Sequence, residues 1–297
     1  MKADLNLEHI SPLRRPFALL KDKQRISTIY EDRWVNHPQA VSLRATARAL
    51  YEMPTRIQAQ CMLISGRPGM GKTSLFKRIE SDMEALRKRN VESYSCIAFS
   101  LASDPTLNCF EDTIGEALGV PIGKIRNGLI PKAFCRLAHL RNLRLVLIDE
   151  VHNLLNAGRI DQRKNLAFLR ALSSPPMSLS IIAFGVDDAV HAISSDAQLE
   201  RRFQMCDLSP WKQNDSFRQF LTAYEGTLPL RSPSELWHQE KVKFLLSATD
   251  GITDSIVKRI TRGAVWAILD GKERIDLACL EKATDIPPYL DRFDDEE

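Results

Sequence analysis

A glycine-rich segment carries the residue types whose spacing points most directly to chemistry. Residues 66–73 read GRPGMGKT, with a lysine and a threonine directly after the last glycine. Glycines let such a loop curl so that several backbone N–H groups face inward, and the lysine adds a positive charge, which together fit a phosphate group. The threonine hydroxyl suits a Mg²⁺ ion that accompanies phosphates. We therefore expect a phosphate-binding loop made of Gly66, Arg67, Pro68, Gly69, Met70, Gly71, Lys72, Thr73 and Ser74, with Thr73 as a Mg²⁺ ligand.

Two neighbouring carboxylates supply the second element that nucleotide chemistry needs. Asp149 and Glu150 end the apolar run LRLVLIDE at residues 143–150. A carboxylate at the tip of a strand can hold Mg²⁺ directly or through water, and its neighbour can orient or deprotonate an attacking water. Such a pair can also be an ordinary acidic strand end, but the glycine-rich loop upstream favours the nucleotide site. We expect Asp149 to bind Mg²⁺ and Glu150 to act as the catalytic base.

A pair of arginines, Arg201 and Arg202, stands in the segment DAQLERRFQ at residues 196–204. An arginine can stabilise the charge that develops on a transferred phosphoryl group. The alternative is a solvated or ion-paired helix end, and composition alone favours that alternative.

Apolar runs and helical periods alternate through the first two thirds of the chain and define the elements that position these residues. The glycine-rich loop follows a strand and opens a helix, which is the context that a phosphate-binding loop requires. The alternation predicts an α/β fold, a parallel sheet with helices on both faces. From Trp211 onward only helical periods appear. Strands are expected at 60–65, 95–100, 143–150 and 179–185, and helices at 74–89, 109–118 and 163–174.

Four parts make up the expected domain organisation. They are an N-terminal extension at 1–50 with a helix around 39–53, an α/β nucleotide-binding core at 51–210, a small all-helical lid at 211–285 and an acidic tail at 286–297. Acidic tails are most often solvated and less often docking peptides.

Composition limits the classes of protein to which the chain can belong. The 297 residues carry a net charge of only +3, which does not by itself indicate nucleic-acid binding. The six cysteines form no C-x-x-C pair, so the sequence suggests neither a zinc site nor a disulfide framework. No apolar run is long enough for a membrane span, and the N-terminus lacks the apolar region of a signal peptide. We expect a protein of the reducing cytoplasm without a membrane partner.

With these elements in place, residues 30–280 resemble the AAA+ ATPases. The segment QLERRF resembles their arginine-finger segment, which points into the nucleotide of the neighbouring subunit. The resemblance implies that Arg201 or Arg202 acts in trans, and it also implies ATP as the nucleotide and an oligomeric assembly.

The order and spacing of four segments narrow the resemblance to the TniB/TnsC family, the ATP-dependent target-selection regulators of heteromeric DNA transposons. These segments are DRWVNHPQA, LIDEVHNLLNAG, QRKNLAFLRALSS and AISSDAQLERRF. The resemblance implies a protein that binds ATP, assembles on duplex DNA as a ring or helical filament, marks a target and recruits the transposase, together with a target-selector protein. In the family, the DNA contacts come from the region that corresponds to residues 119–132 here. The expected contacts with DNA phosphates are therefore Lys124, Arg126 and Asn127, and a weaker candidate outside this region is Arg159. The alternative is that these residues lie in a solvated loop. Phosphate contacts without base readout make binding sequence-tolerant.

Two positions depart from the family pattern. Val186 stands where relatives carry a polar residue after the strand that ends in glycine, and Asp187 and Asp188 follow it. In the lid, Asp254 takes the place of an arginine three residues after Gly251, and the nearest bases are Lys258 and Arg259. Both departures favour slow, regulatory ATP hydrolysis.

Two other functions remain open. One is an AAA+ switch or scaffold that binds only protein, and the other is a replication initiator or helicase loader. The latter usually adds a winged-helix domain, for which little sequence remains after residue 203.

Overall fold

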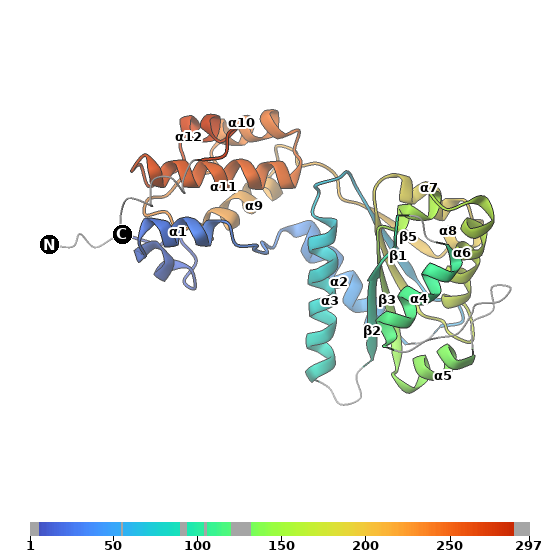
Figure 1. Ribbon diagram of the computed structural model, residues 1–297. Coiled ribbons are helices and arrows are strands. Elements are labelled where there is room, and N and C mark those ends of the chain that lie inside the picture. The colour runs from blue at the N-terminus through green and yellow to red at the C-terminus, as the bar shows by residue number, and fades with distance from the viewer. Residues whose placement is uncertain (1–5, 55, 90–93, 104–105, 120–131, 288–297) are drawn as a thin grey trace. The chain divides into compact units, whose positions relative to one another are not determined.

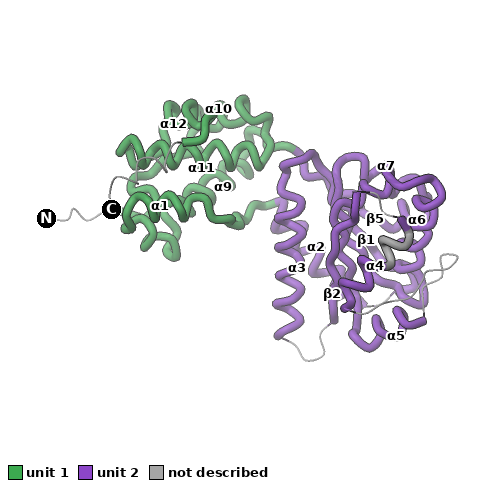
Figure 2. Tube along the Cα trace, in the orientation of Figure 1, with its two compact units in different colours: residues 1–38, 210–297 green, residues 39–209 purple. Residues whose placement is uncertain are grey.

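The computed structural model describes residues 6–54, 56–89, 94–103, 106–119 and 132–287, with the side chains of 107–111 left out. The chain forms two compact units, one of residues 1–38 and 210–297 and the other of residues 39–209 (Figures 1 and 2). None of the helices that the described residues form has both the length and the apolar character that crossing a membrane requires.

The unit of residues 39–209 is built on a parallel five-stranded sheet in the order β2-β3-β4-β1-β5. Figure 1 shows α2 and α3 on one face of the sheet and α4, α5 and α6 on the other. The strands are β1 (Cys61–Ser65), β2 (Ser95–Ser100), β3 (Leu143–Asp149), β4 (Ser180–Gly185) and β5 (Phe203–Asp207). The helices are α2 (Pro38–Glu52), α3 (Lys72–Arg89), α4 (Leu107–Leu118), α5 (Lys132–Leu140), η2 (Val151–Leu155), α6 (Arg159–Leu172), α7 (Asp188–Ser194) and α8 (Ala197–Glu200).

The central strands β1 and β4 are buried along their whole length, and β3 nearly so, which explains why they read as continuous apolar runs. Because β3, β4 and β1 are neighbours and parallel, their carboxyl ends lie side by side at the same end of the sheet. There Ser65 is in register with Gly185 on β4 and with Asp207 on β5. The loops that follow β1, β3 and β4 therefore converge, as ligand-binding loops do in open α/β sheets.

The α/β fold, with its parallel sheet between two helical layers, is confirmed. The four expected strands match β1 to β4 within one residue at each end. The sequence did not indicate β5, which lies at the edge of the sheet. Its pattern of one buried residue followed by mostly exposed ones gives only a weak apolar signal.

The second unit is helical and has its own hydrophobic core. That core joins side chains of α1 to those of α9, α10, α11 and α12, with Phe217, Leu245 and Ile260 fully buried within it. The elements of this unit are η1 (Arg15–Leu19), α1 (Asp22–Ile29), α9 (Asp215–Glu225), α10 (Gln239–Thr249), α11 (Thr253–Leu269) and α12 (Leu277–Lys282).

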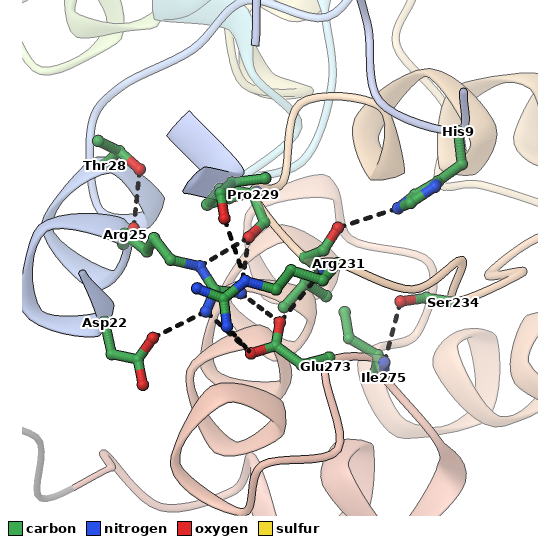
Figure 3. A network of polar contacts seen from close by, with 11 residues as sticks. His9, Asp22, Arg25, Thr28, Pro229, Arg231, Ser234, Glu273 and Ile275 are labelled. Atoms are coloured by element: carbon green, nitrogen blue, oxygen red, sulfur yellow. Dashed lines mark hydrogen bonds and ion pairs between the residues drawn. The ribbon is translucent and has the colours of Figure 1, made fainter. Parts of the chain in front are cut away.

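A buried arginine fastens the N-terminal segment to the C-terminal helices of this unit (Figure 3). The side chain of Arg25 is fully buried, and its guanidinium donates to both carboxylate oxygens of Glu273, to Asp22 and to the carbonyl of Pro229. Arg231 donates to Glu273 as well and reaches the carbonyl of Ala18. A buried charge is tolerated when it is paired and fully hydrogen-bonded in this way.

This arrangement differs from the expected N-terminal extension at residues 1–50. Residues up to 38 belong to the same compact unit as the C-terminal helices, and the helix expected around 39–53 is α2 of the sheet unit. The difference arises because Arg25, near the start of the chain, is buried and is neutralised by Glu273 from the C-terminal part of this unit.

Candidate nucleotide site

The glycine-rich loop lies between the end of β1 and the start of α3, where backbone geometry rather than side chains gives it its shape. Gly71 has φ 87°, a left-handed conformation that favours glycine, and a Cβ on it would meet no atom within 4 Å. Gly66 is needed for a different reason, since its Cβ would lie 2.7 Å from the carbonyl oxygen of Leu208. Met70 is buried and anchors the loop, whereas Arg67 and Pro68 are exposed.

Lys72, the first residue of α3, turns its side chain back into this loop. Its ammonium group donates to the carbonyl oxygens of Gly66 at 2.8 Å and Arg67 at 3.0 Å. Burial lowers the pKa of Lys72, against the opposing effect of the negative charges of Glu150, Asp149 and Asp187. The lysine therefore lies near these three acidic residues, and its charge is directed at the loop.

Thr73 and Asp149 lie close together although 76 positions separate them in the chain. The hydroxyl of Thr73 donates to Oδ2 of Asp149 at 3.1 Å, and Oδ1 of the same carboxylate accepts from the backbone N–H of Glu150 at 2.9 Å. Thr73 is exposed and Asp149 is buried at the tip of β3. A hydroxyl and a carboxylate at this separation are the hard oxygen donors that Mg²⁺ prefers, so the residues fit that ion.

Glu150 directly follows β3 and has φ 57° and ψ 35°, a left-handed conformation that is unusual for a side chain of this kind. Its side chain is 39% exposed, and Oε2 lies 3.2 Å from Nε2 of His152. Nothing in the residue pattern distinguishes His152 as a functional residue. The one signal was its position two residues after Glu150 in the string DEVHN, which served only as a family marker.

The end of β4 places Val186 half-buried and Asp187 exposed beside these groups. A valine offers no hydrogen bond, so this position has no polar side chain to contact a phosphate.

In the helical unit, Asp254 pairs with Lys258 at 2.7 Å, and Arg259 donates to the hydroxyl of Thr284 at 2.6 Å. Both basic residues, Lys258 and Arg259, thus bind partners within the helical unit.

The two arginines after α8 have different surroundings. Arg202 donates through Nη1 to the carbonyl oxygen of Ser173 at 2.9 Å, to the hydroxyl of Ser173 at 2.9 Å and to that of Ser174 at 2.8 Å. Arg201 is exposed, and its side chain has no hydrogen-bond or ion-pair partner among the residues that the structure describes. Asp196 caps α8 by accepting from two backbone N–H groups and so fixes the turn that presents Arg201.

The expected DNA contacts are only partly within the described chain. Lys124, Arg126 and Asn127 lie outside the described residues. Arg159 is exposed at the first position of α6, on the segment that follows the carboxylates.

Several solved structures that are similar to the chain are ORC and Cdc6 proteins. The ORC1 protein of Aeropyrum pernix in complex with DNA has 16% identity and a TM-score of 0.62, with 87% of this chain and 68% of that chain covered. Drosophila ORC bound to DNA has 14% identity and a TM-score of 0.60, covering 89% and 65%. Cdc6p of Pyrobaculum aerophilum has 17% identity and a TM-score of 0.58, covering 89% and 70%. The chain thus spans about two thirds of their length.

The likeness to these structures shows the fold, which is a P-loop core of the AAA+ type with a helical part. None of the curated proteins matches the chain. The family model described as "Bacterial TniB protein" matches residues 25–213, more than half of the chain, and covers the glycine-rich loop, both carboxylates and both arginines. The chain belongs to the TniB family.

Proposed function

We propose that the protein is an ATP-dependent, DNA-binding regulator of transposition that oligomerises on duplex DNA, selects the target and recruits the transposase. The observation that carries the proposal is the convergence of Lys72, Thr73, Asp149 and Glu150 at one edge of the sheet. Membership of the TniB family supports the role in transposition. The ORC structures, which are described as bound to DNA, support the choice of duplex DNA as a partner.

The loop and Lys72 bind the phosphates of ATP. The ammonium group exchanges its bonds to the carbonyls of Gly66 and Arg67 for bonds to phosphate oxygens, which are stronger because both partners are charged. The start of α3 adds the partial positive charge of a helix N-terminus to the same place.

Thr73 and Asp149 would hold Mg²⁺, which would neutralise negative charge on the phosphates of ATP. The hydroxyl of Thr73 lies 3.1 Å from the buried carboxylate of Asp149, and the backbone N–H of Glu150 keeps that carboxylate in place. Glu150 accepts a proton from the attacking water through the carboxylate of its partly exposed side chain.

Arg201 completes the nucleotide site of a neighbouring subunit. Arg201 is exposed, and its guanidinium has no hydrogen-bond partner within the described chain. The guanidinium of Arg202 instead donates to Ser173 and Ser174. Arg202 therefore holds the turn and Arg201 acts from it, which makes hydrolysis dependent on assembly.

Hydrolysis is slow and regulatory in this proposal. Val186 cannot donate to the γ-phosphate, and the lid bases Lys258 and Arg259 are held by Asp254 and Thr284. A slow ATPase serves as a timer for residence on DNA.

Phosphate contacts by Lys124, Arg126, Asn127 and Arg159 make DNA binding nearly independent of sequence. Replacing Arg126 with alanine should weaken binding to all duplexes alike and reduce the slope of log K against log salt by about one unit. A loss confined to one sequence would contradict the phosphate-contact role.

The proposal is tested by measuring ATP hydrolysis and DNA binding together. Wild-type protein should bind duplex DNA with ATP, and Lys72→Ala should lose both activities. Lys77→Ala is the matched control, because Lys77 is an exposed lysine further along α3. Equal loss in both variants, or DNA binding that ignores the nucleotide, would refute the proposal.

A further inference from the structure

We propose that His152 is a positioning residue that holds the carboxylate of Glu150 in the orientation that hydrolysis needs. The inference rests on the proposed ATPase function and names a further residue of that site. The contact behind it is the one between Nε2 of His152 and Oε2 of Glu150, at 3.2 Å.

The segment that carries His152 is firmly packed. Val151 and Leu154 of η2 are fully buried on either side of it. At Gly185 on β4, the place of a Cβ would be only 3.2 Å from a methyl group of Val151 and 3.3 Å from the backbone nitrogen of His152. The backbone of His152 is therefore held in place against the end of β4, which restricts the positions that its ring can take.

The ring of His152 has a single polar contact. Its side chain is only 21% exposed, and Nδ1 is buried without a hydrogen-bond partner among the described residues. A buried polar atom without a partner costs free energy, so an apolar side chain would fill this space at less cost. A histidine here is thus poorly explained by packing, and the polar contact with Glu150 is what distinguishes it from a leucine.

Glu150 depends on that contact for its orientation. His152 is the one side chain, within the described part of the chain, that lies within ion-pair distance of its carboxylate. With the proton on Nε2, the ring presents a donor 3.2 Å from Oε2 and leaves Oε1 free for the water. Without the donor, a 39% exposed glutamate side chain can rotate among several orientations.

The consequence is a loss of turnover without a loss of binding. If this contact contributes as much as one hydrogen bond, its loss corresponds to a roughly 3- to 10-fold change in rate, so His152→Leu should lower kcat by that factor. KM for ATP should stay unchanged, because His152 contacts neither Lys72 nor Thr73. His152→Gln should keep most of the activity, because its amide nitrogen can take the place of Nε2.

Steady-state ATP hydrolysis by the full chain with duplex DNA tests the inference. The variants are His152→Leu, His152→Phe, His152→Gln, Glu150→Gln and the double variant Glu150→Gln with His152→Leu. Circular dichroism and the affinity for ATP verify folding, and His152→Phe replaces His152→Leu if the latter does not fold. Because His152 acts through Glu150, the double variant should be no slower than Glu150→Gln alone.

Three results would overturn the inference: wild-type kcat in both apolar variants, an equally low kcat in His152→Gln, or a further loss of the same size in the double variant. Each leaves the proposed function intact if Glu150→Gln remains slow. No hydrolysis by wild type, or hydrolysis that Glu150→Gln does not slow, overturns the proposed function and the inference with it.

Discussion

Arg201 and Arg202 are adjacent, yet their replacement should have opposite consequences for stability and for activity. Arg202→Ala removes a charged donor that contacts the carbonyl and hydroxyl of fully buried Ser173 and the hydroxyl of Ser174, all within 2.9 Å. Hydrogen bonds to a charged group contribute about 1.5–3 kcal/mol each, but one nitrogen shares these three. Ser173 also keeps other partners, the carbonyl of Leu169 and the N–H of Ala59. We therefore expect a loss of about 2–3 kcal/mol rather than the sum.

Thermal unfolding measures this difference. For a unit of the size of residues 39–209, such a loss lowers Tm by about 5–10 °C. Arg201→Ala breaks no contact among the described residues, so its stability should stay within about 0.5 kcal/mol of wild type. It should instead abolish the part of ATP hydrolysis that rises with protein concentration.

Mixing two inactive proteins tests whether Arg201 acts on a neighbour. Lys72→Ala brings an intact Arg201, and Arg201→Ala brings an intact nucleotide site, so mixed assemblies should regain part of the ATPase activity. These roles are contradicted if Arg202→Ala melts like wild type and Arg201→Ala does not. Co-assembled mixtures that stay inactive would also contradict them.

Three further predictions concern the nucleotide and the buried ion pair. Lys72→Ala should abolish tight ATP binding in a calorimeter, because the charge that faces the phosphates is gone, whereas Lys77→Ala should bind normally. Glu150→Gln should bind ATP, hydrolyse it more slowly and stay on DNA longer; an unchanged ATPase rate would exclude Glu150 as the base. Glu273→Gln should destabilise the helical unit by about 3 kcal/mol in urea unfolding, because it leaves buried Arg25 with less compensation. Burial alone would raise the pKa of Glu273, but the bonds and charge of Arg25 outweigh burial and lower that pKa. This stabilisation is present above about pH 4.3, the ordinary value, and should vanish as pH falls through the lowered pKa, a loss absent from the glutamine variant.

The sequence predicts the elements around the nucleotide site well because their signals are local. Strands buried on both faces read as apolar runs, and the glycine-rich loop needs its residue types in fixed order. Gly66 shows what local signals cannot predict. Its close approach to Leu208 comes from the pairing of β1 with β5, a strand that the local apolar pattern does not reveal.

Long-range pairing explains what the sequence could not reveal. The burial of Arg25 depends on Glu273, which is 248 positions away, so no local pattern shows that this charge is interior. The choice between Arg201 and Arg202 depends likewise on Ser173 at the end of another helix. His152 looks like any residue of a family motif until its ring is found against Glu150.

The central claim is that ATP at this site controls assembly on DNA, and negative-stain microscopy with duplexes of unrelated sequence tests it most directly. Wild-type protein should form rings or filaments on every duplex with ATP and none with ADP. Glu150→Gln should form longer-lived assemblies with ATP, and Lys72→Ala should form none. Assemblies that appear equally with ATP, with ADP and in Lys72→Ala, or no DNA-bound assembly under any of these conditions, would contradict the account.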